Sequence, residues 1–275
     1  MKTILVPTDF SKASENALNY AVEIAKRTQA TLVLFHVFQI PVVPAETPIT
    51  LPYDEIEKDA TDSLKKLRES IILKNGNKIN VQYECKLGFI AEEIKLISEK
   101  NQVDLIIMGM EGAGFLTEKI IGSVTTSLIN KAKCPVMIIG NEVKFKSIKK
   151  IVLASDYNEI KNKSVLKPLK ELANLFKSHV YVLNVVKPEL SPISSTAKAA
   201  EGIKLSHLLE DVEHSFHYSE NENVIDGINN FVALKQIDIL VMIPRVHTAL
   251  HNLFIEPQTK QMAFHTQIPL LTIHE

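Results

Sequence analysis

The stretch Ile4-Leu5-Val6-Pro7-Thr8-Asp9-Phe10 decides the fold, because its pattern occurs a second time in the chain. The counterpart, Ile151-Val152-Leu153-Ala154-Ser155-Asp156-Tyr157, lies 147 residues later, and both runs end in a small residue, an aspartate and an aromatic residue. Residues 103–108 likewise align with 237–242, and residues 134–137 with 268–271, both at an offset of 134. A repeat on this scale indicates two tandem copies of one domain, the second about 13 residues shorter in its middle.

Each copy alternates short apolar runs with stretches of helical periodicity, a pattern typical of βαβ units and a mainly parallel sheet. In the first copy, strands are expected at residues 3–8, 31–37, 79–84, 103–108 and 135–139. Strands that are apolar nearly throughout, such as residues 105–108, indicate helices on both faces of the sheet. The sequence therefore predicts an α/β protein of two tandem, doubly wound, five-stranded parallel-sheet domains with a Rossmann-like arrangement, residues 1–143 and 148–275.

The first helix of each copy follows from the spacing of its apolar residues. Residues 17–25 in the first copy and 165–176 in the second place apolar side chains at helical intervals. Ser11 or Ser14 is expected to cap the first of these helices. Residues 38–54, with four prolines and no helical periodicity, are expected to form a long loop.

Composition excludes several classes of function. The 275 residues carry 31 Lys and Arg against 32 Asp and Glu, so no basic field is available for nucleic acid. No apolar run reaches the roughly 18 residues that a membrane span requires. The two cysteines, Cys85 and Cys134, are too few for a disulfide framework, are expected to serve packing, and favour a reducing cytoplasm.

The segment Met108–Thr126 concentrates four of the chain's nine glycines just where the fourth strand should end. In an open parallel sheet, ligands bind beyond the carboxyl ends of the strands, and glycine allows the backbone to approach them closely. Gly122 and Ser123 then precede an amphipathic stretch, residues 124–132, so their amides should lie at a helix N-terminus that can hold an anion such as phosphate. The spacing matches neither a Walker A loop nor a dinucleotide-binding glycine motif.

This glycine spacing occurs together with Val-Pro-Thr-Asp-Phe-Ser at 6–11, Phe-His-Val at 35–37 and Cys-Pro-Val at 134–136. In combination, the four motifs closely resemble the universal stress protein family, over essentially the whole chain as two tandem domains. In the ATP-binding branch of that family, the glycine pattern marks the nucleotide site. The resemblance thus implies adenine-nucleotide binding by the N-terminal domain, with ATP as ligand, AMP or ADP as alternatives, and Mg²⁺ as companion ion.

The resemblance also implies a role for each matching residue. Asp9 would accept hydrogen bonds from the adenosine part, and Val37 would contact adenine through its backbone. Glycines would approach ribose and phosphates, and the start of the following helix would hold phosphate oxygens. The implied nucleotide-binding residues are Pro7, Thr8, Asp9, Val37, Met108, Gly109, Gly112, Gly122, Ser123 and Val124. The competing structural interpretation makes Asp9 a capping residue and the glycines ordinary turn residues.

The second copy lacks the glycine signals. The offset places Ile243, Val246, Glu256 and Pro257 where the first copy has Gly109, Gly112, Gly122 and Ser123. β-Branched side chains would obstruct the backbone approach, and a carboxylate would repel phosphate. We therefore expect no ATP in the second domain, where Asp156 alone survives and is expected to act as a cap.

Histidines offer a separate hint, because eight of nine follow residue 150. His247 and His251 stand four apart and His214 and His217 three apart, but two-histidine pairs arise by chance, and no metal site is predicted. His214 and His217 also fall in an expected strand, where this spacing puts them on opposite faces. No arrangement of residues predicts a catalytic site.

Three hypotheses stay open at this point. The first is a cytoplasmic stress-response protein that uses ATP as a conformational signal, with slow hydrolysis at most. The second is a nucleotide-independent scaffold whose last strands, 136–139 and 270–273, pair with each other, with a second chain or with a partner protein through an edge strand. The third is an ATP-using enzyme with Glu111 or Glu118 as the metal-holding carboxylate.

Overall fold

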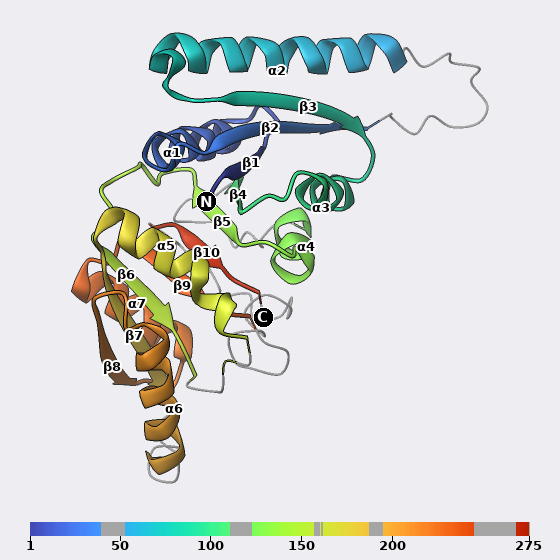
Figure 1. The fold of residues 1–275 in the computed structure, drawn as a ribbon. Coiled ribbons are helices and arrows are strands. Elements are labelled where there is room, and N and C mark those ends of the chain that lie inside the picture. The colour runs from blue at the N-terminus through green and yellow to red at the C-terminus, as the bar shows by residue number, and fades with distance from the viewer. Residues whose placement is uncertain are drawn as a thin grey trace, which may run out of the picture.

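A computed structural model describes residues 1–39, 53–110, 123–156, 160, 162–186, 195–244 and 268–274 (Figure 1). Its N-terminal half alternates strands and helices as predicted. The elements in chain order are β1 (Thr3–Pro7), α1 (Lys12–Thr28), β2 (Thr31–Phe38), α2 (Tyr53–Asn75), the 3-10 helix η1 (Gly76–Lys78), β3 (Val81–Leu87), α3 (Ile90–Lys100), β4 (Leu105–Met110), α4 (Ser123–Lys131) and β5 (Val136–Gly140).

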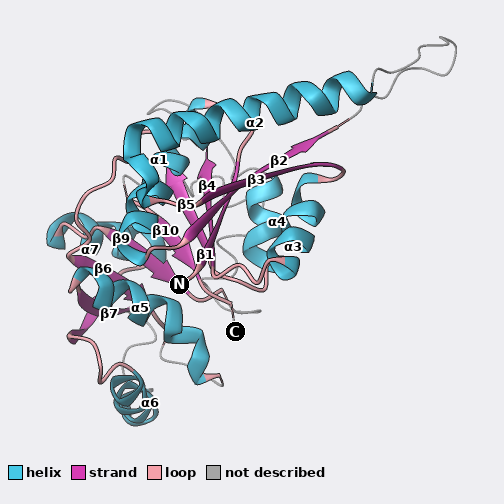
Figure 2. Ribbon diagram, turned by 45° about the horizontal axis from the view of Figure 1, so that its top comes forward, coloured by secondary structure: helices cyan, strands magenta, loops and turns pink. Residues whose placement is uncertain are grey.

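The C-terminal half repeats this plan. Its elements are β6 (Lys150–Ala154), the 3-10 helix η2 (Lys163–Leu166), α5 (Lys167–Phe176), β7 (His179–Val186), α6 (Ser195–Leu208), β8 (His214–Glu220), α7 (Val224–Lys235), β9 (Ile239–Met242) and β10 (Leu270–Thr272). Helices lie on both faces of the strands in each half (Figure 2).

All strands of the described residues form one sheet in the order β3-β2-β1-β4-β5-β10-β9-β6-β7-β8. Every pair is parallel except β5 and β10, which run antiparallel with Leu270 opposite Ile138 and Thr272 opposite Val136. The hydroxyl of Thr272 donates to the carbonyl oxygen of Val136 at 3.2 Å. Two five-stranded parallel sheets are thus joined through their last strands, which confirms the predicted fold class. Of the pairings left open for those strands, the structure shows the one within the chain.

Burial on both faces follows from the apolar strands. In β1, Ile4 and Val6 belong to the cluster beneath α1, α2 and α5, whereas Leu5 belongs to the cluster beneath α3, α4 and α7. All five residues of β5 are buried. Because each central strand contributes side chains to both clusters, the helices of both layers are held by one continuous sheet.

Helix α1 begins where the sequence predicted. Ser11 is its N-cap, and its side chain accepts a hydrogen bond from the backbone amide of Ser14 at 3.3 Å. Ala17, Ala21 and Ile24 on one face are fully buried against the sheet. The helix ends at Gln29, which adopts a left-handed conformation.

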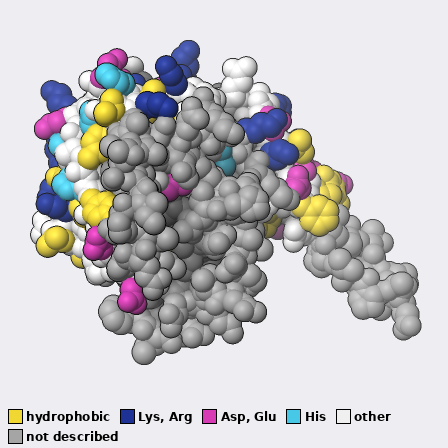
Figure 3. Space-filling model, turned by 90° about the horizontal axis from the view of Figure 1, so that it is seen from below, with side chains coloured by type: hydrophobic (Ala, Val, Ile, Leu, Met, Phe, Trp, Pro, Cys, Tyr) yellow, Lys and Arg dark blue, Asp and Glu magenta, His cyan; other side chains and the backbone are white. Residues whose placement is uncertain are grey.

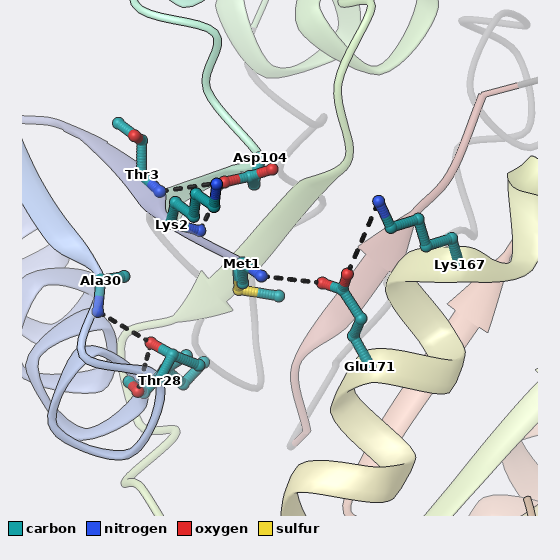
Figure 4. A network of polar contacts seen from close by, with 9 residues as sticks. Met1, Lys2, Thr3, Thr28, Ala30, Asp104, Lys167 and Glu171 are labelled. Carbon is teal, nitrogen blue, oxygen red and sulfur yellow. Dashed lines mark hydrogen bonds and ion pairs between the residues drawn. The ribbon is translucent and has the colours of Figure 1, made fainter.

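Strands β3 and β4 each begin two residues later than predicted. The 3-10 turn η1 occupies the chain immediately before β3. Ahead of β4, Asp104 lies outside the strand because its Oδ2 accepts the backbone amides of Lys2 at 2.5 Å and Thr3 at 2.9 Å (Figure 4). Asp238 makes the same contacts with the amides of Lys149 and Lys150 at 2.7 and 2.9 Å. The repeat therefore includes an aspartate clamp at the amino end of each central strand.

The two halves also contact each other through an aromatic cluster. Phe145, in the connecting segment, lies 4.9 Å from the ring of Tyr20 and 6.2 Å from that of Phe176, and the Arg27 guanidinium stacks over both phenylalanines. The amino group of Met1 forms an ion pair with Glu171 of α5 at 3.2 Å (Figure 4). These contacts attach α1 of the first half to α5 of the second.

Among the described side chains that Figure 3 shows, both basic and acidic groups appear along the margins of the view. None of the described helices is long and apolar enough to cross a membrane.

Candidate functional site

A pocket of about 600 Å³ opens at the carboxyl ends of β1, β2 and β4 in the N-terminal half. Seven of the ten predicted nucleotide-binding residues line it: Pro7, Thr8, Asp9, Val37, Met108, Gly109 and Val124. Gly112 and Gly122 lie outside the described residues. Ser123 is the first residue of α4, as expected, but only its backbone is described. The structure therefore brings together the predicted residues from three strand ends and one helix start.

The turn after β1 is held by local hydrogen bonds. The amide of Thr8 donates to the carbonyl of Phe35 at 2.8 Å, and its buried hydroxyl lies 3.1 Å from that of Ser14. The same Thr8 oxygen accepts the Phe10 amide at 3.1 Å. Phe10 has a φ of 63°, a conformation that a non-glycine residue adopts only where its surroundings enforce it. The pocket floor is thus a constrained turn.

Asp9 takes part in that turn. Its Oδ1 accepts both the amide of Ser11 at 3.0 Å and the Ser11 hydroxyl at 2.6 Å. Burial raises the pKa of this carboxyl, but the hydrogen bonds from Ser11 and Ser14 outweigh burial, and the pKa lies below its usual value. Asp9 is therefore ionised at neutral pH and able to accept further hydrogen bonds. The interpretation of Asp9 as a helix cap is wrong, because Ser11 is the N-cap of α1 and Asp9 instead accepts hydrogen bonds from Ser11. A binding role for Asp9 is compatible with these contacts.

Gly109 is required by the protein itself. A Cβ atom at this position would lie 2.3 Å from the carbonyl oxygen of Ala13 and 2.8 Å from the amide nitrogen of Ser14. Because both are backbone atoms in the first turn of α1, they cannot move aside cheaply. The glycine thus allows α1 to pack on the end of β4, a reason that the sequence did not reveal.

Three helices begin at the pocket. Lining residues lie at or near the first turns of α1 (Ser11), α3 (Ile90) and α4 (Val124). Phe89, the N-cap of α3, provides no side-chain hydrogen bond to the helix. Helix N-termini carry partial positive charge and unpaired amides, so their convergence favours an anionic ligand.

Sequence reasoning missed several lining residues. His36 belongs to the Phe-His-Val motif, yet it was not predicted to be part of the site. Its Nδ1 lies 2.8 Å from the carbonyl oxygen of Thr8, and since a carbonyl only accepts, Nδ1 carries the hydrogen. The ring of Phe10 contacts that of His36 at 4.7 Å. Ile90 and Ile94 of α3 add an apolar wall, which their helical spacing could have indicated.

The second half differs at the matching place. Ile243, the counterpart of Gly109, is buried with 7% of its surface exposed, so the second half has a branched side chain where Gly109 allows the close approach of α1 in the first half. Val246, Glu256 and Pro257 lie outside the described residues. Asn184 takes the place of His36, and its Nδ2 donates to the carbonyl of Ser155 at 2.7 Å.

The other histidines and cysteines that the sequence singled out lie away from this pocket or outside the described residues. His214 and His217 lie in β8 on opposite faces, the former near Ser206 of α6 and the latter against Phe231 of α7. Cys85 and Cys134 are half-buried, unpaired and packed against the apolar clusters, as expected. Outside the described residues lie His247, His251, Glu111 and Glu118.

Comparison with known proteins agrees with this fold and places the chain in a family. The model of the universal stress protein family matches residues 1–140 and again 147–274, so the chain belongs to that family and contains two such domains in tandem. Universal stress protein MJ0531 of Methanocaldococcus jannaschii is 32% identical over 141 residues, which are 50% of this chain and 81% of that protein. Universal stress protein YxiE of Bacillus subtilis is 33% identical over 144 residues, covering 50% and 97%.

A solved structure resembles the whole chain. A universal stress protein from Archaeoglobus fulgidus superimposes with a TM-score of 0.75 at 17% identity, covering 98% of this chain and 97% of the other. At that identity the likeness concerns the fold, and it extends over both domains.

Proposed function

We propose that the N-terminal domain binds an adenine nucleotide, with ATP as the main ligand, in the pocket at the ends of β1, β2 and β4. The observation that carries this proposal is the convergence of seven predicted binding residues and three helix N-termini on one cavity of about 600 Å³. That volume falls in the range of about 300–1,000 Å³ that is usual for small-molecule sites. The four sequence motifs shared with the ATP-binding branch of the family support the same ligand.

The pocket offers a matching surface to each part of the nucleotide. Val37, Ile90 and Ile94 supply apolar contact for a purine. The ionised Asp9 accepts hydrogen bonds from ribose hydroxyls, which donate well to a carboxylate. The first amides of α4, at Ser123 and Val124, bind the phosphates, which Mg²⁺ accompanies. Gly112 and Gly122 are the further phosphate-binding residues that the family resemblance implies. The nucleotide acts as a conformational signal in a stress response, with slow hydrolysis at most.

The second domain takes no part in this binding, since Ile243 fills the position of Gly109. It contributes instead to the joined sheet through β10. Because β5 and β10 pair with each other, an edge-to-edge homodimer or a partner strand would have to use β3 or β8, the outer strands of the described sheet.

The test is the nucleotide content of the purified chain, released by denaturation and separated by chromatography, followed by titration with ATP and Mg²⁺. We expect one adenine nucleotide per chain. The double variant Gly122→Glu with Ser123→Pro, which copies the second domain, should lose it while retaining the circular dichroism of the parent. The change Asp156→Asn in the second domain is the matched control and should leave the stoichiometry at one. A chain that is empty and takes up no added ATP would favour the nucleotide-independent scaffold.

A further inference from the structure

A cluster of polar side chains lies at the amino ends of β7 and β8, in the second domain. His179 Nε2 is 2.7 Å from the hydroxyl oxygen of Ser215, and His217 Nε2 is 3.0 Å from the same oxygen. On its other side, His179 Nδ1 is 3.3 Å from Oε1 of Glu213. The Nε2 atoms of both imidazoles thus point at the Ser215 oxygen, and the Glu213 carboxylate lies next to His179.

In a neutral imidazole one ring nitrogen carries a hydrogen and the other presents a lone pair. When each ring carries its hydrogen on Nδ1, both Nε2 atoms present lone pairs toward the Ser215 hydroxyl. Glu213 favours this state of His179, because its Oε1 lies 3.3 Å from Nδ1.

The surroundings keep the two rings in place and leave them accessible. The Tyr181 ring contacts those of His179 and His217 at centroid distances of 4.6 and 5.3 Å. Phe231 of α7 covers the far side of His217 at 5.2 Å. The His179 side chain is 27% exposed, so an ion can reach the cluster from solvent.

The first domain shows that the fold does not require this cluster. The pairing of Leu32 with Val81 corresponds to that of Val180 with His214, which makes Thr31, Gln82 and Glu84 the counterparts of His179, Ser215 and His217. There, Thr31 accepts a hydrogen bond from Asn80 at 3.1 Å, and Glu84 pairs with Lys100 at 3.3 Å. These are ordinary surface contacts, and the imidazoles are particular to the second domain.

We propose that His179 and His217 form a binding site for a divalent transition-metal ion, with Ser215 and water completing the coordination and Glu213 orienting His179. Imidazole is a preferred ligand of Cu²⁺, Ni²⁺ and Zn²⁺, and a carboxylate on the second ring nitrogen is the usual outer partner of a metal-bound histidine. Among the described residues, no group of three or more His, Cys, Asp or Glu side chains is placed so that it could hold a metal ion. The site therefore has two protein nitrogens, and Cu²⁺ should bind more tightly than Ni²⁺ or Zn²⁺.

The probe is Cu²⁺ added to the intact chain, followed by calorimetry and electron paramagnetic resonance. We expect one site whose spectrum shows two imidazole nitrogens. His179→Gln and His217→Gln should each remove one nitrogen and the tight binding, and Glu213→Gln should weaken binding about 10- to 100-fold.

The matched control is His214→Gln, because His214 lies on the same strand but on its opposite face, toward Ser206. This variant should bind Cu²⁺ like the parent. Circular dichroism and thermal unfolding identify any variant that has lost its fold. If the folded double variant His179→Gln with His217→Gln binds Cu²⁺ with unchanged affinity and spectrum, the proposal is wrong.

Discussion

His36 and Asn184 occupy the same position in the two domains and make the same hydrogen bond with different side chains. His36 Nδ1 donates to the carbonyl of Thr8 at 2.8 Å, and Asn184 Nδ2 donates to the carbonyl of Ser155 at 2.7 Å. The backbone repeats the match, since the amides of Thr8 and Ser155 donate to the carbonyls of Phe35 and Leu183 at 2.8 and 2.9 Å. Either residue therefore braces the turn after the first strand of its domain. The hydrogen bond to Thr8 holds the His36 ring in the wall of the pocket.

The brace predicts unequal effects of two substitutions. Asn184 is buried, so Asn184→Leu should remove its hydrogen bond to the Ser155 carbonyl and lower the free energy of unfolding by about 1–3 kcal/mol. His36→Asn should change it by less than about 1 kcal/mol, because asparagine already makes this bond in the second domain. Urea denaturation of both variants provides the comparison. If His36→Asn and Asn184→Leu lowered the free energy of unfolding equally, asparagine would be unable to replace His36 in the first domain.

Gly109→Ala tests the close contact between β4 and α1. The new methyl group would lie 2.3 Å from the Ala13 carbonyl oxygen, so α1 must shift, and we expect a loss of about 1–3 kcal/mol in thermal unfolding experiments. The matched control is Gly202→Ala in α6, where an added Cβ meets no heavy atom within 4 Å apart from the adjacent residues and backbone of its own helix. That change should stabilise the helix by about 0.5–1 kcal/mol. A neutral Gly109→Ala would mean that α1 packs less closely than described.

The order of the elements was predictable from sequence because it depends on local information. Apolar runs set the strands, helical spacing set the helices, and the repeat fixed the tandem arrangement. The role of Gly109 was not predictable, because it arises from α1, whose nearest atoms are about a hundred residues away in the chain. The starts of β3 and β4 were also missed, since a 3-10 turn and the side chain of Asp104, rather than hydrophobicity, determine them.

The candidate sites likewise differ in whether local sequence or contacts between distant residues determine them. The strand-end residues Pro7 to Asp9 and Val37 were implied by the resemblance to the universal stress protein family, and they line one pocket because parallel strands bring their carboxyl ends together. The pair His179 and His217 was not predicted, because their approach depends on the register of β7 against β8. His214 and His217, which are close in sequence, point to opposite faces.

The aspartate clamps predict a matched pair of losses. Asp104→Ala would leave the amides of Lys2 and Thr3 without their acceptor, and Asp238→Ala would do the same for Lys149 and Lys150. Each should lower the free energy of unfolding by about 1.5–3 kcal/mol, measured in urea. Asp62→Ala, on the exposed side of α2, is the control and should stay within about 0.5 kcal/mol. If only one of the two substitutions lowered the free energy of unfolding, the two aspartates would not contribute equally to stability.

His274 predicts how stability depends on pH. It follows β10, and its Nε2 donates to the carbonyl of Ile129 in α4. Burial lowers its pKa from the ordinary 6.5, although the backbone contacts with Ile129 and Cys134 oppose the change. As the pH falls below 6.5, the unfolded chain takes up a proton at this residue before the folded chain does. Its contribution to stability is therefore present above pH 6.5 and is lost as the pH falls toward the folded-state pKa.

The variant His274→Gln keeps a donor for Ile129 but cannot titrate. The free energy of unfolding, measured in urea at several values between about pH 7.5 and 5, should fall less steeply for the variant than for the parent. Parallel curves would assign the pH dependence to other groups.

The two thiols predict different reactivities. Burial raises the pKa of Cys134 to about 11, despite a hydrogen bond with Ser98. At pH 8 only about one molecule in a thousand then carries the reactive thiolate at this position. The pKa of Cys85 is also raised by burial, but Cys85 is less enclosed. Iodoacetamide should therefore alkylate Cys85 at least about tenfold faster in the native protein, as followed by mass spectrometry of the peptides. In urea the two rates should converge, and equal rates in the native state would contradict the burial of Cys134.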